Sequence, residues 1–146
     1  MPETPQQYIE RIMGNLKGQD PLKVQADTAK KLERLVKRAS PAKLRKRPAP
    51  GKWSVGEILT HLADCELVLG WRMRQILSSP GVPIQAFDQD VWASTGHYEK
   101  RDGRKSLELF RSLRESNLAL LKSLTPEQRK QHGMHEERGV ETTSLP

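Results

Sequence analysis

The chain has 146 residues, a formal charge of +7 and an apolar content of 35%. This length allows one hydrophobic core of ordinary size and excludes two. No uncharged stretch approaches the ~20 apolar residues of a membrane span, and the N-terminus lacks the basic flank and apolar region of a secretory signal. The lone cysteine, Cys65, excludes an internal disulfide and is typical of a reducing compartment. We therefore expect a single cytoplasmic domain over residues 1–146, without membrane contact.

Two helix-opening signals lie in the first part of the chain. Residues 4–7 (TPQQ) combine a capping threonine, a proline at the first helical position and a glutamine at the third. Asp20-Pro21 repeats the opening. Apolar residues at helical spacing follow each signal, as far as Leu16 and Ser40 respectively. The prolines and glycine of residues 41–53 then indicate an irregular, basic connection.

The strongest start signal is the capping box of residues 54–57 (SVGE). The hydroxyl of Ser54 can accept the amide of Glu57, whose carboxylate can reach back to the Ser54 amide. Trp53 and Ile58 stand at the two positions of a hydrophobic staple. We expect a helix from this box to about Leu77.

The second half begins with a long connection, residues 82–104, that has no sustained periodicity. Connections of this length are usually functional or disordered, and their aromatic residues favour a partly ordered loop with a helical turn near residues 88–94. Ser106 is the expected cap of a helix reaching Leu124, and residues 125–128 open a further turn. No segment alternates convincingly between apolar and polar residues, so we expect no sheet.

The end of the chain predicts a loop over residues 133–139 and the approach to another helix over residues 141–146. Three amphipathic helices without a fourth leave an apolar groove. We therefore expect a homodimer or a higher self-association that covers this groove. Leu67 and Trp71, an apolar pair on nearly the opposite face of their helix, indicate either a central helix or a second contact with another subunit.

Ten Lys or Arg residues and one acid, Glu33, lie between Lys30 and Lys52. Such a segment could attract phosphate backbones without reading sequence. The alternative is a solvated helix end and loop. No aromatic residue lies between Lys30 and Arg47, so the segment offers no stacking platform for single strands. A nucleic-acid partner is the less favoured interpretation, and the sequence identifies no small-molecule substrate.

His61 lies about 80° from the centre of an apolar stripe on the helix after Ser54. The stripe comprises Ile58, Leu62, Cys65, Leu69, Met73 and Ile76. A histidine at such a margin can bind a metal inside a bundle, or it can bond to Asp64 or a backbone carbonyl. The spacing alone favours the second interpretation, because a metal site needs three or more ligands. The place of Cys65 in the stripe predicts an inert, buried thiol.

Other polar residues give weaker indications. His132 and His135 are three residues apart but flank a glycine, so a shared metal is not expected there. Asn117 lies within an apolar stripe, which favours a satisfied buried amide. Asp88 and Asp90 either cap a helical turn or line a cleft, and both interpretations stay open.

Residues 47–64 (RPAPGKWSVGEILTHLAD) resemble the signature of the DinB/YfiT-like superfamily, and residues 83–93 and 110–117 are similar to the same family. The resemblance implies an all-α fold, a four-helix bundle in up-down-down-up order, often dimeric, here with the last helix largely missing. It also implies a metal, Zn²⁺ or Ni²⁺, bound by three histidines. His61 is the counterpart of one ligand; the other two would come from an H-x-x-x-H pair on the last helix.

The resemblance further implies metal-dependent chemistry of the hydrolase or thiol-transfer type, with Asp64 as a possible support for the metal ligand. With His61 alone, we expect metal binding to be weak or absent and the chain to have no useful metal-dependent activity. The catalytic residues are unknown, no other cofactor is indicated, and whether the chain is an enzyme stays open. The alternative is a helical interaction or dimerisation module without chemistry.

Overall fold

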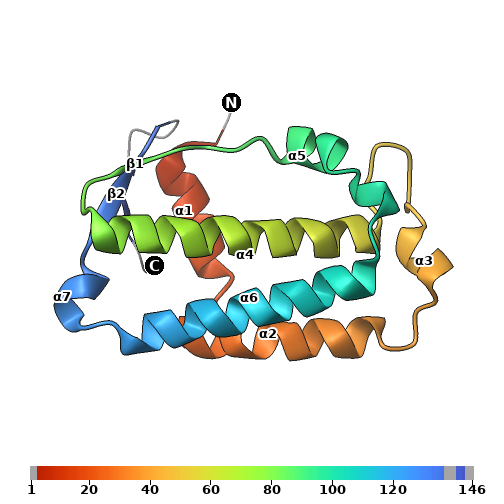
Figure 1. The fold of residues 1–146 in the computed structure, drawn as a ribbon, viewed down its shortest axis with the longest axis horizontal. Coiled ribbons are helices and arrows are strands. Elements are labelled where there is room, and N and C mark those ends of the chain that lie inside the picture. The colour runs from red at the N-terminus through yellow and green to blue at the C-terminus, as the bar shows by residue number, and fades with distance from the viewer. Residues whose placement is uncertain (1–2, 137–140, 144–146) are drawn as a thin grey trace.

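The structure is a computed structural model that describes residues 3–136 and 141–143. Its framework is formed by three helices, α2 (Pro21–Val36), α4 (Val55–Ser78) and α6 (Gly103–Ser123). Helices α4 and α6 run side by side in the same direction, and α2 packs on α6 in the opposite direction (Figure 1). This up-down-down order agrees with the expected bundle. Within the described ranges, no helix of comparable length follows α6.

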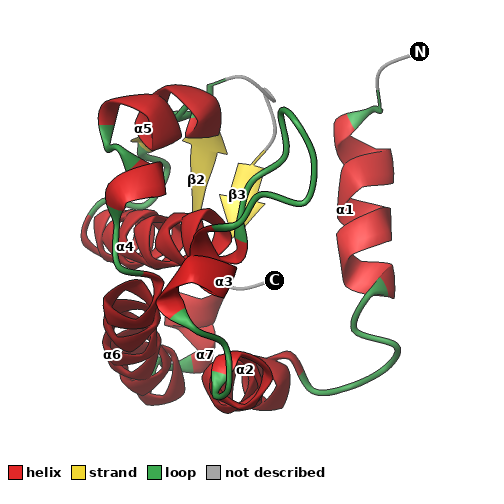
Figure 2. Ribbon diagram, turned by 90° about the vertical axis from the view of Figure 1, so that its right-hand side faces the viewer, coloured by secondary structure: helices red, strands yellow, loops and turns green. Residues whose placement is uncertain are grey.

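Helix α1 (Pro5–Gly14) begins at the expected capping box, in which Thr4 and Gln7 bond to each other's amides. Figure 2 shows α1 set apart from the three framework helices. Three of its apolar side chains are therefore 39–42% exposed: Ile9, Ile12 and Met13.

The start of α4 is confirmed, but the start of α6 lies earlier than expected. The Glu57 amide donates to the Ser54 hydroxyl at 3.2 Å, and the Ser54 amide donates to the Glu57 carboxylate at 2.7 Å. Helix α6 is capped by Asp102, whose carboxylate accepts the amide of Arg104. The expected cap, Ser106, is instead buried, with its hydroxyl 2.8 Å from that of Thr60 on α4.

The basic connection after α2 contains a helix that the sequence did not predict. Helix α2 ends at Val36, before the expected Ser40, and α3 (Pro41–Arg45) follows with Ser40 as its cap. The Ser40-Pro41 pair ends the run of helical spacing, and the same pair opens the next helix.

The remaining helical segments are short. They are α5 (Gln89–Thr95), the 3₁₀ helix η1 (Tyr98–Lys100) and α7 (Pro126–Arg129). Helix α5 confirms the turn expected near residues 88–94, and α7 has the expected capping box between Thr125 and Gln128.

A small three-stranded sheet contradicts the expectation of no sheet. Its strands are β1 (Pro83–Ile84), β2 (His132–His135) and β3 (Glu141–Thr143). Strand β2 pairs in parallel with β1 and antiparallel with β3. The strands are too short for a period-two pattern, and the parallel pair joins distant segments. Part of the expected 133–139 loop and part of the expected helix approach over 141–146 are therefore strand; residues 137–140 and 144–146 lie outside the described residues.

The core lies mainly between α4, α6 and α2. Its largest cluster consists of Ala29, Val36, Leu44, Leu59, Ala63, Leu107 and Phe110. A second cluster consists of Met73, Leu121 and Leu124. Among the helices of the described segments, none combines the length and the apolarity needed to cross a bilayer.

The face of α4 that α6 covers differs from the expected stripe. Ile58 and Leu69, both in the expected stripe, are 42% and 48% exposed. The covered face carries polar or small residues among its apolar ones, including Glu57, Thr60 and Gly70. A pattern of apolar residues alone therefore could not identify this buried face. The burial of these polar and small residues depends on hydrogen bonds and close contact with distant segments.

Candidate functional site

His61 lies in the second turn of α4 and is half-buried. The Trp53 ring meets its imidazole edge-on, with the ring centres 5.1 Å apart. The Cys65 sulfur, one turn further along α4, lies 3.4 Å from Nε2 and 3.7 Å from Nδ1 of the imidazole. The capping box of α4 fixes where the helix starts, so it also fixes the position of His61 relative to Trp53. The imidazole is thus held between an indole ring and a thiol.

Tyr98, in η1, packs against Trp53 from another part of the chain. Its side chain is buried, its ring lies edge-on to Trp53 at 6.2 Å, and its hydroxyl donates to the Asp64 carboxylate. Burial, together with this carboxylate, raises the pKa of Tyr98 well above its ordinary value. The hydroxyl therefore stays protonated and acts as a donor. Asp64, which the sequence offered as one of two possible partners of His61, accepts the hydrogen bond of Tyr98.

Burial lowers the pKa of His61, and the nearby carboxylates of Asp64 and Asp90 oppose that effect. Neutral imidazole, the form that binds metals, is favoured as a result. Burial also raises the pKa of the Cys65 thiol. A neutral thiol is a poor nucleophile, which agrees with the expected inert cysteine, although Cys65 is only half-buried.

The residues around His61 do not by themselves form a metal site. A bound transition metal requires three or four ligands at short distances. In the part of the chain that the structure describes, no three His, Cys, Asp or Glu residues come together in a way that could hold an ion. His132 and His135 lie in β2 and belong to no such group. The role of His61 as a ligand stays a prediction.

A buried polar network joins α4 to α6 further along the bundle. The Arg114 guanidinium lies 2.9 Å from the Glu66 carboxylate. The Asn117 amide donates to the Glu66 carbonyl at 3.0 Å and to its carboxylate at 3.1 Å. Asn117 is thus the satisfied buried amide that its position predicts. The apolar pattern did not identify Glu66 as a core residue, although Leu59, Ala63 and Glu66 follow one another at helical spacing.

A second buried carboxylate anchors the segment that carries Trp53. Glu57 accepts a hydrogen bond from Arg47 at 3.0 Å and forms an ion pair with the same guanidinium. Arg47, together with the Ser54 amide, lowers the pKa of Glu57 to about 2. The ion pair ties the start of the connection before α4 to the first turn of the helix, and so helps to place Trp53 beside His61.

A groove of about 460 Å³ lies between α4 and α5, and His61 is not among its lining residues. Trp71, Phe87 and Trp92 contribute its aromatic walls. The Arg72 guanidinium lies over the Phe87 ring, 5.8 Å from its centre. Asp88 caps α5 and also lines this groove. Both interpretations of that residue, as a helix cap and as part of a cleft, are therefore confirmed.

Comparison with known proteins places these features in a family. The DinB superfamily matches residues 26–145. YfiT of Bacillus subtilis (strain 168), which is described as a candidate metal-dependent hydrolase, is 26% identical over 114 residues, covering 78% of this chain and 64% of YfiT. The chain thus spans somewhat less than two thirds of the length of that relative.

Two solved structures are similar to the fold. The YfiT structure, reported to have an unusual four-helix bundle topology, matches with a TM-score of 0.77 and 25% identity, covering 84% of this chain and 70% of YfiT. A mycothiol-dependent maleylpyruvate isomerase matches with a TM-score of 0.62 and 11% identity, covering 86% of this chain and 53% of the isomerase. The second likeness concerns the fold alone.

Proposed function

Because the chain belongs to the DinB superfamily, we propose that it contributes to a metal-dependent enzyme of the hydrolase or thiol-transfer type, in which His61 is one metal ligand. The metal would be Zn²⁺ or Ni²⁺. The observation that carries the proposal is the half-buried imidazole of His61, whose pKa burial lowers. The description of YfiT as a candidate metal-dependent hydrolase supports the reaction class.

The neighbours of His61 have supporting roles in this proposal. Trp53 and Cys65 restrict the imidazole from two sides. The hydrogen bond from Tyr98 to Asp64 holds η1 against α4 and so keeps the Tyr98 and Trp53 rings in contact. The described residues supply one ligand, so further ligands would have to come from outside them. By itself, the chain is then expected to bind metal weakly and to have no useful metal-dependent activity.

Calorimetric titration of residues 1–146 with Zn²⁺ or Ni²⁺ tests the assignment of His61. We expect weak binding, with a dissociation constant on the order of 100 µM, because one imidazole replaces the usual three or four ligands. The substitution His61→Asn should abolish this binding. His97→Asn is the matched control, because His97 is exposed and its positive φ of 49° is a conformation that asparagine tolerates.

Two results would contradict the proposal in different ways. Binding that His61→Asn leaves unchanged would remove His61 as a ligand. Stoichiometric, tight binding that depends on His61 would instead contradict the expectation that the chain alone is a poor metal binder. Near-ultraviolet circular dichroism of each variant would show that the bundle remains folded.

A second candidate function is a helical interaction module without chemistry. The observation that favours it is the exposure of Leu67 and Trp71 on the outer face of α4, at 54% and 63%. Isolated exposed apolar residues are ordinary, but these two are adjacent on the helix and Trp71 lines the groove between α4 and α5. We propose that this face joins two copies of the chain.

A further inference from the structure

The basic segment between Lys30 and Lys52 is almost free of ion pairs. All ten of its Lys and Arg side chains are exposed. Among the described residues, Arg47 alone of the ten pairs with a carboxylate, that of Glu57. Glu33, the single acid of the segment, forms an ion pair with Arg111 of α6 at 3.2 Å. Within the described segments, nine cations therefore form no ion pair, although Asp27 attracts Lys30 and Lys31 at longer range: Lys30, Lys31, Arg34, Lys37, Arg38, Lys43, Arg45, Lys46 and Lys52.

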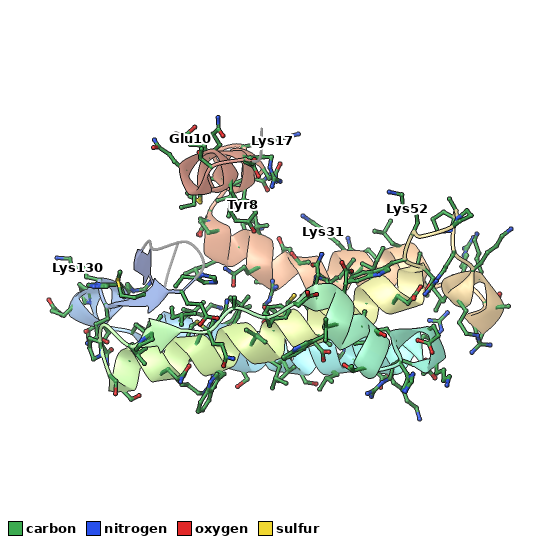
Figure 3. All side chains as sticks on the ribbon, turned by 90° about the horizontal axis from the view of Figure 1, so that it is seen from above. Tyr8, Glu10, Lys17, Lys31, Lys52 and Lys130 are labelled. Atoms are coloured by element: carbon green, nitrogen blue, oxygen red, sulfur yellow. The ribbon has the colours of Figure 1, made fainter. Side chains whose placement is uncertain are left out.

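The fold gathers these cations on one part of the molecule. They lie on the second half of α2, on α3 and on the connection to α4. Figure 3 shows Lys31 and Lys52 on the same side of the bundle, with Lys130 at the opposite end. We call the nine cations and the groove beside them the basic surface.

The basic surface is concave where α2 meets α6. A groove of about 610 Å³ is lined by two apolar residues, Val36 and Leu107, by four cations, Lys30, Arg34, Lys37 and Arg104, and by two acids, Glu33 and Glu108. Arg104 is held in place by donating to the carbonyls of Val36, Lys37 and Ala39, at 3.1, 3.2 and 2.7 Å. No carboxylate of the residues that the structure describes forms an ion pair with Arg104, although Glu108 lines the same groove.

Such a concentration of like charge disfavours the folded chain. Lys30 and Arg34 stand four residues apart on α2, as do Arg34 and Arg38. Like charges at this spacing destabilise a helix by a few tenths of a kcal/mol per pair, and charges within ~10 Å repel one another at moderate salt. A polyanion placed along the surface would relieve this repulsion and release its own condensed counterions.

We propose that the basic surface binds the phosphate backbone of a nucleic-acid duplex without reading its sequence. The concave groove suits a duplex backbone better than a flat anionic bilayer. The absence of aromatic residues between Lys30 and Arg47 favours a duplex over a single strand, which is usually bound by stacking. From the sequence, a solvated helix end and loop was favoured, because charge alone does not identify a site. In the described residues, the nearby acids Glu33 and Glu57 have arginine partners and Asp27 has Lys23, whereas Glu108, which lines the groove, forms no ion pair.

Fluorescence anisotropy of a labelled duplex of about 30 base pairs, titrated with residues 1–146 between about 50 and 200 mM salt, tests the proposal. We expect measurable binding at the lowest salt and a steep, linear loss of log affinity with log salt. The triple variant Lys30→Gln/Arg34→Gln/Lys37→Gln should weaken binding by on the order of tenfold or more. It should also reduce the salt slope by about 2.7, which corresponds to three phosphate contacts.

The control variant Lys17→Gln/Lys122→Gln/Lys130→Gln removes the same charge from exposed lysines outside the basic surface. It should change the affinity by less than about threefold, because general attraction by net charge is weaker than contact. Equal losses of duplex affinity in the two triple variants would show that net charge alone causes the binding, and would overturn the proposal. Absence of duplex binding at low salt would also overturn it, as would binding to phosphatidylserine vesicles without binding to the duplex.

Discussion

Two buried carboxylates of α4 depend on arginines from other segments. Glu57 is joined to Arg47 before the helix, and Glu66 to Arg114 on α6. The carboxylates are 3% and 4% exposed, so neither is stabilised by bulk water. A buried charge that loses its partner is strongly destabilising, even where the intact pair contributes little by itself. Single substitutions at these two residues should therefore have large effects on stability.

The free energy of unfolding should decrease as the pH is lowered and Glu57 becomes protonated. Its folded-state pKa of about 2 lies below the ordinary value of 4.5, chiefly because Arg47 bonds to the carboxylate. Because the folded value is the lower one, this stabilisation is fully present above pH 4.5 and is lost as the pH falls toward 2. The pKa difference alone would correspond to ~3 kcal/mol, and the stabilisation should be smaller than this because the Arg47 side chain is 51% exposed and water screens the pair. Urea unfolding of the wild type and of Glu57→Gln between pH 7 and pH 2 measures it.

The two proteins should converge in stability as the pH approaches 2, since the amide that replaces the carboxylate in Glu57→Gln cannot titrate. The substitution Glu115→Gln is the control, because Glu115 is exposed on α6 and its loss should leave the wild-type pH dependence in place. Parallel stability curves for the wild type and Glu57→Gln would show that Glu57 does not contribute to the acid sensitivity.

Removing Glu66 should destabilise the fold more than removing an exposed partner of an ion pair. In Glu66→Ala, the Arg114 guanidinium, whose side chain is 15% exposed, would lose its carboxylate, and Asn117 would lose one acceptor. We expect a loss of about 3 kcal/mol. Glu33→Ala removes the same group from an exposed pair with Arg111 and should cost about 1 kcal/mol or less. Chemical denaturation compares the two, and equal losses would contradict the structural role of Glu66.

Local spacing predicted the residues that act within one turn of helix and missed those that act between segments. The capping box of Ser54 and Glu57 can be seen in four consecutive residues. The bond between Tyr98 and Asp64 spans 34 positions, and that between Asn117 and Glu66 spans 51. Nothing in the local pattern distinguishes these partners from other polar residues. His61 could be singled out as a margin residue, but its aromatic and thiol neighbours required the fold.

At the scale of elements, the parallel course of α4 and α6 explains the long connection between them. Two adjacent antiparallel helices need only a short loop. Here the chain has to return along the full bundle, and Figure 1 shows the segment with β1, α5 and η1 doing so. The segment has no sustained periodicity because it consists of short elements with different periods. Its length was visible in the sequence, but the pairing of β1 with β2 was not, since it joins segments far apart in the chain.

Close contact between α4 and α6 should make Gly70 sensitive to substitution. A methyl group at Gly70 would lie 2.5 Å from the Asn117 side-chain oxygen, so Gly70→Ala has to displace the amide that bonds to Glu66. We expect a net loss of about 1–3 kcal/mol. Gly14→Ala is the matched control, because Gly14 is also helical and no atom lies within 4 Å of the added methyl group.

At Gly70, in the interior of α4, alanine improves helix propensity by ~0.5–1 kcal/mol, whereas at Gly14, the last residue of α1, the gain is smaller. A loss at Gly70 in spite of this larger gain therefore reports the cost of the contact with Asn117. Thermal unfolding monitored by far-ultraviolet circular dichroism measures both variants. If Gly70→Ala were as stable as Gly14→Ala, α4 and α6 would not be packed as closely as the structure has them.

At the scale of the whole molecule, most of the exposed apolar residues lie outside the basic segment, and Leu35 is the exception. The exposed apolar residues of α1 and of the outer face of α4 lie outside the segment that carries most of the unpaired cations. A net charge of +7 opposes contact between two copies of the chain at low salt. Salt screens that repulsion, and it equally screens attraction to a polyanion. Self-association and duplex binding should therefore respond to salt in opposite directions.

The outer face of α4 should mediate self-association of the chain. Light scattering at high micromolar concentration should detect a dimer or larger species, favoured by salt because the net charge is +7. Leu67→Glu places a charge beside Trp71 and should shift the protein toward the monomer. Leu35→Glu is the matched control, because Leu35 is 80% exposed on α2 and outside this face. A wild-type chain that stays monomeric in high salt, or equal effects of the two substitutions, would exclude this face as the interface.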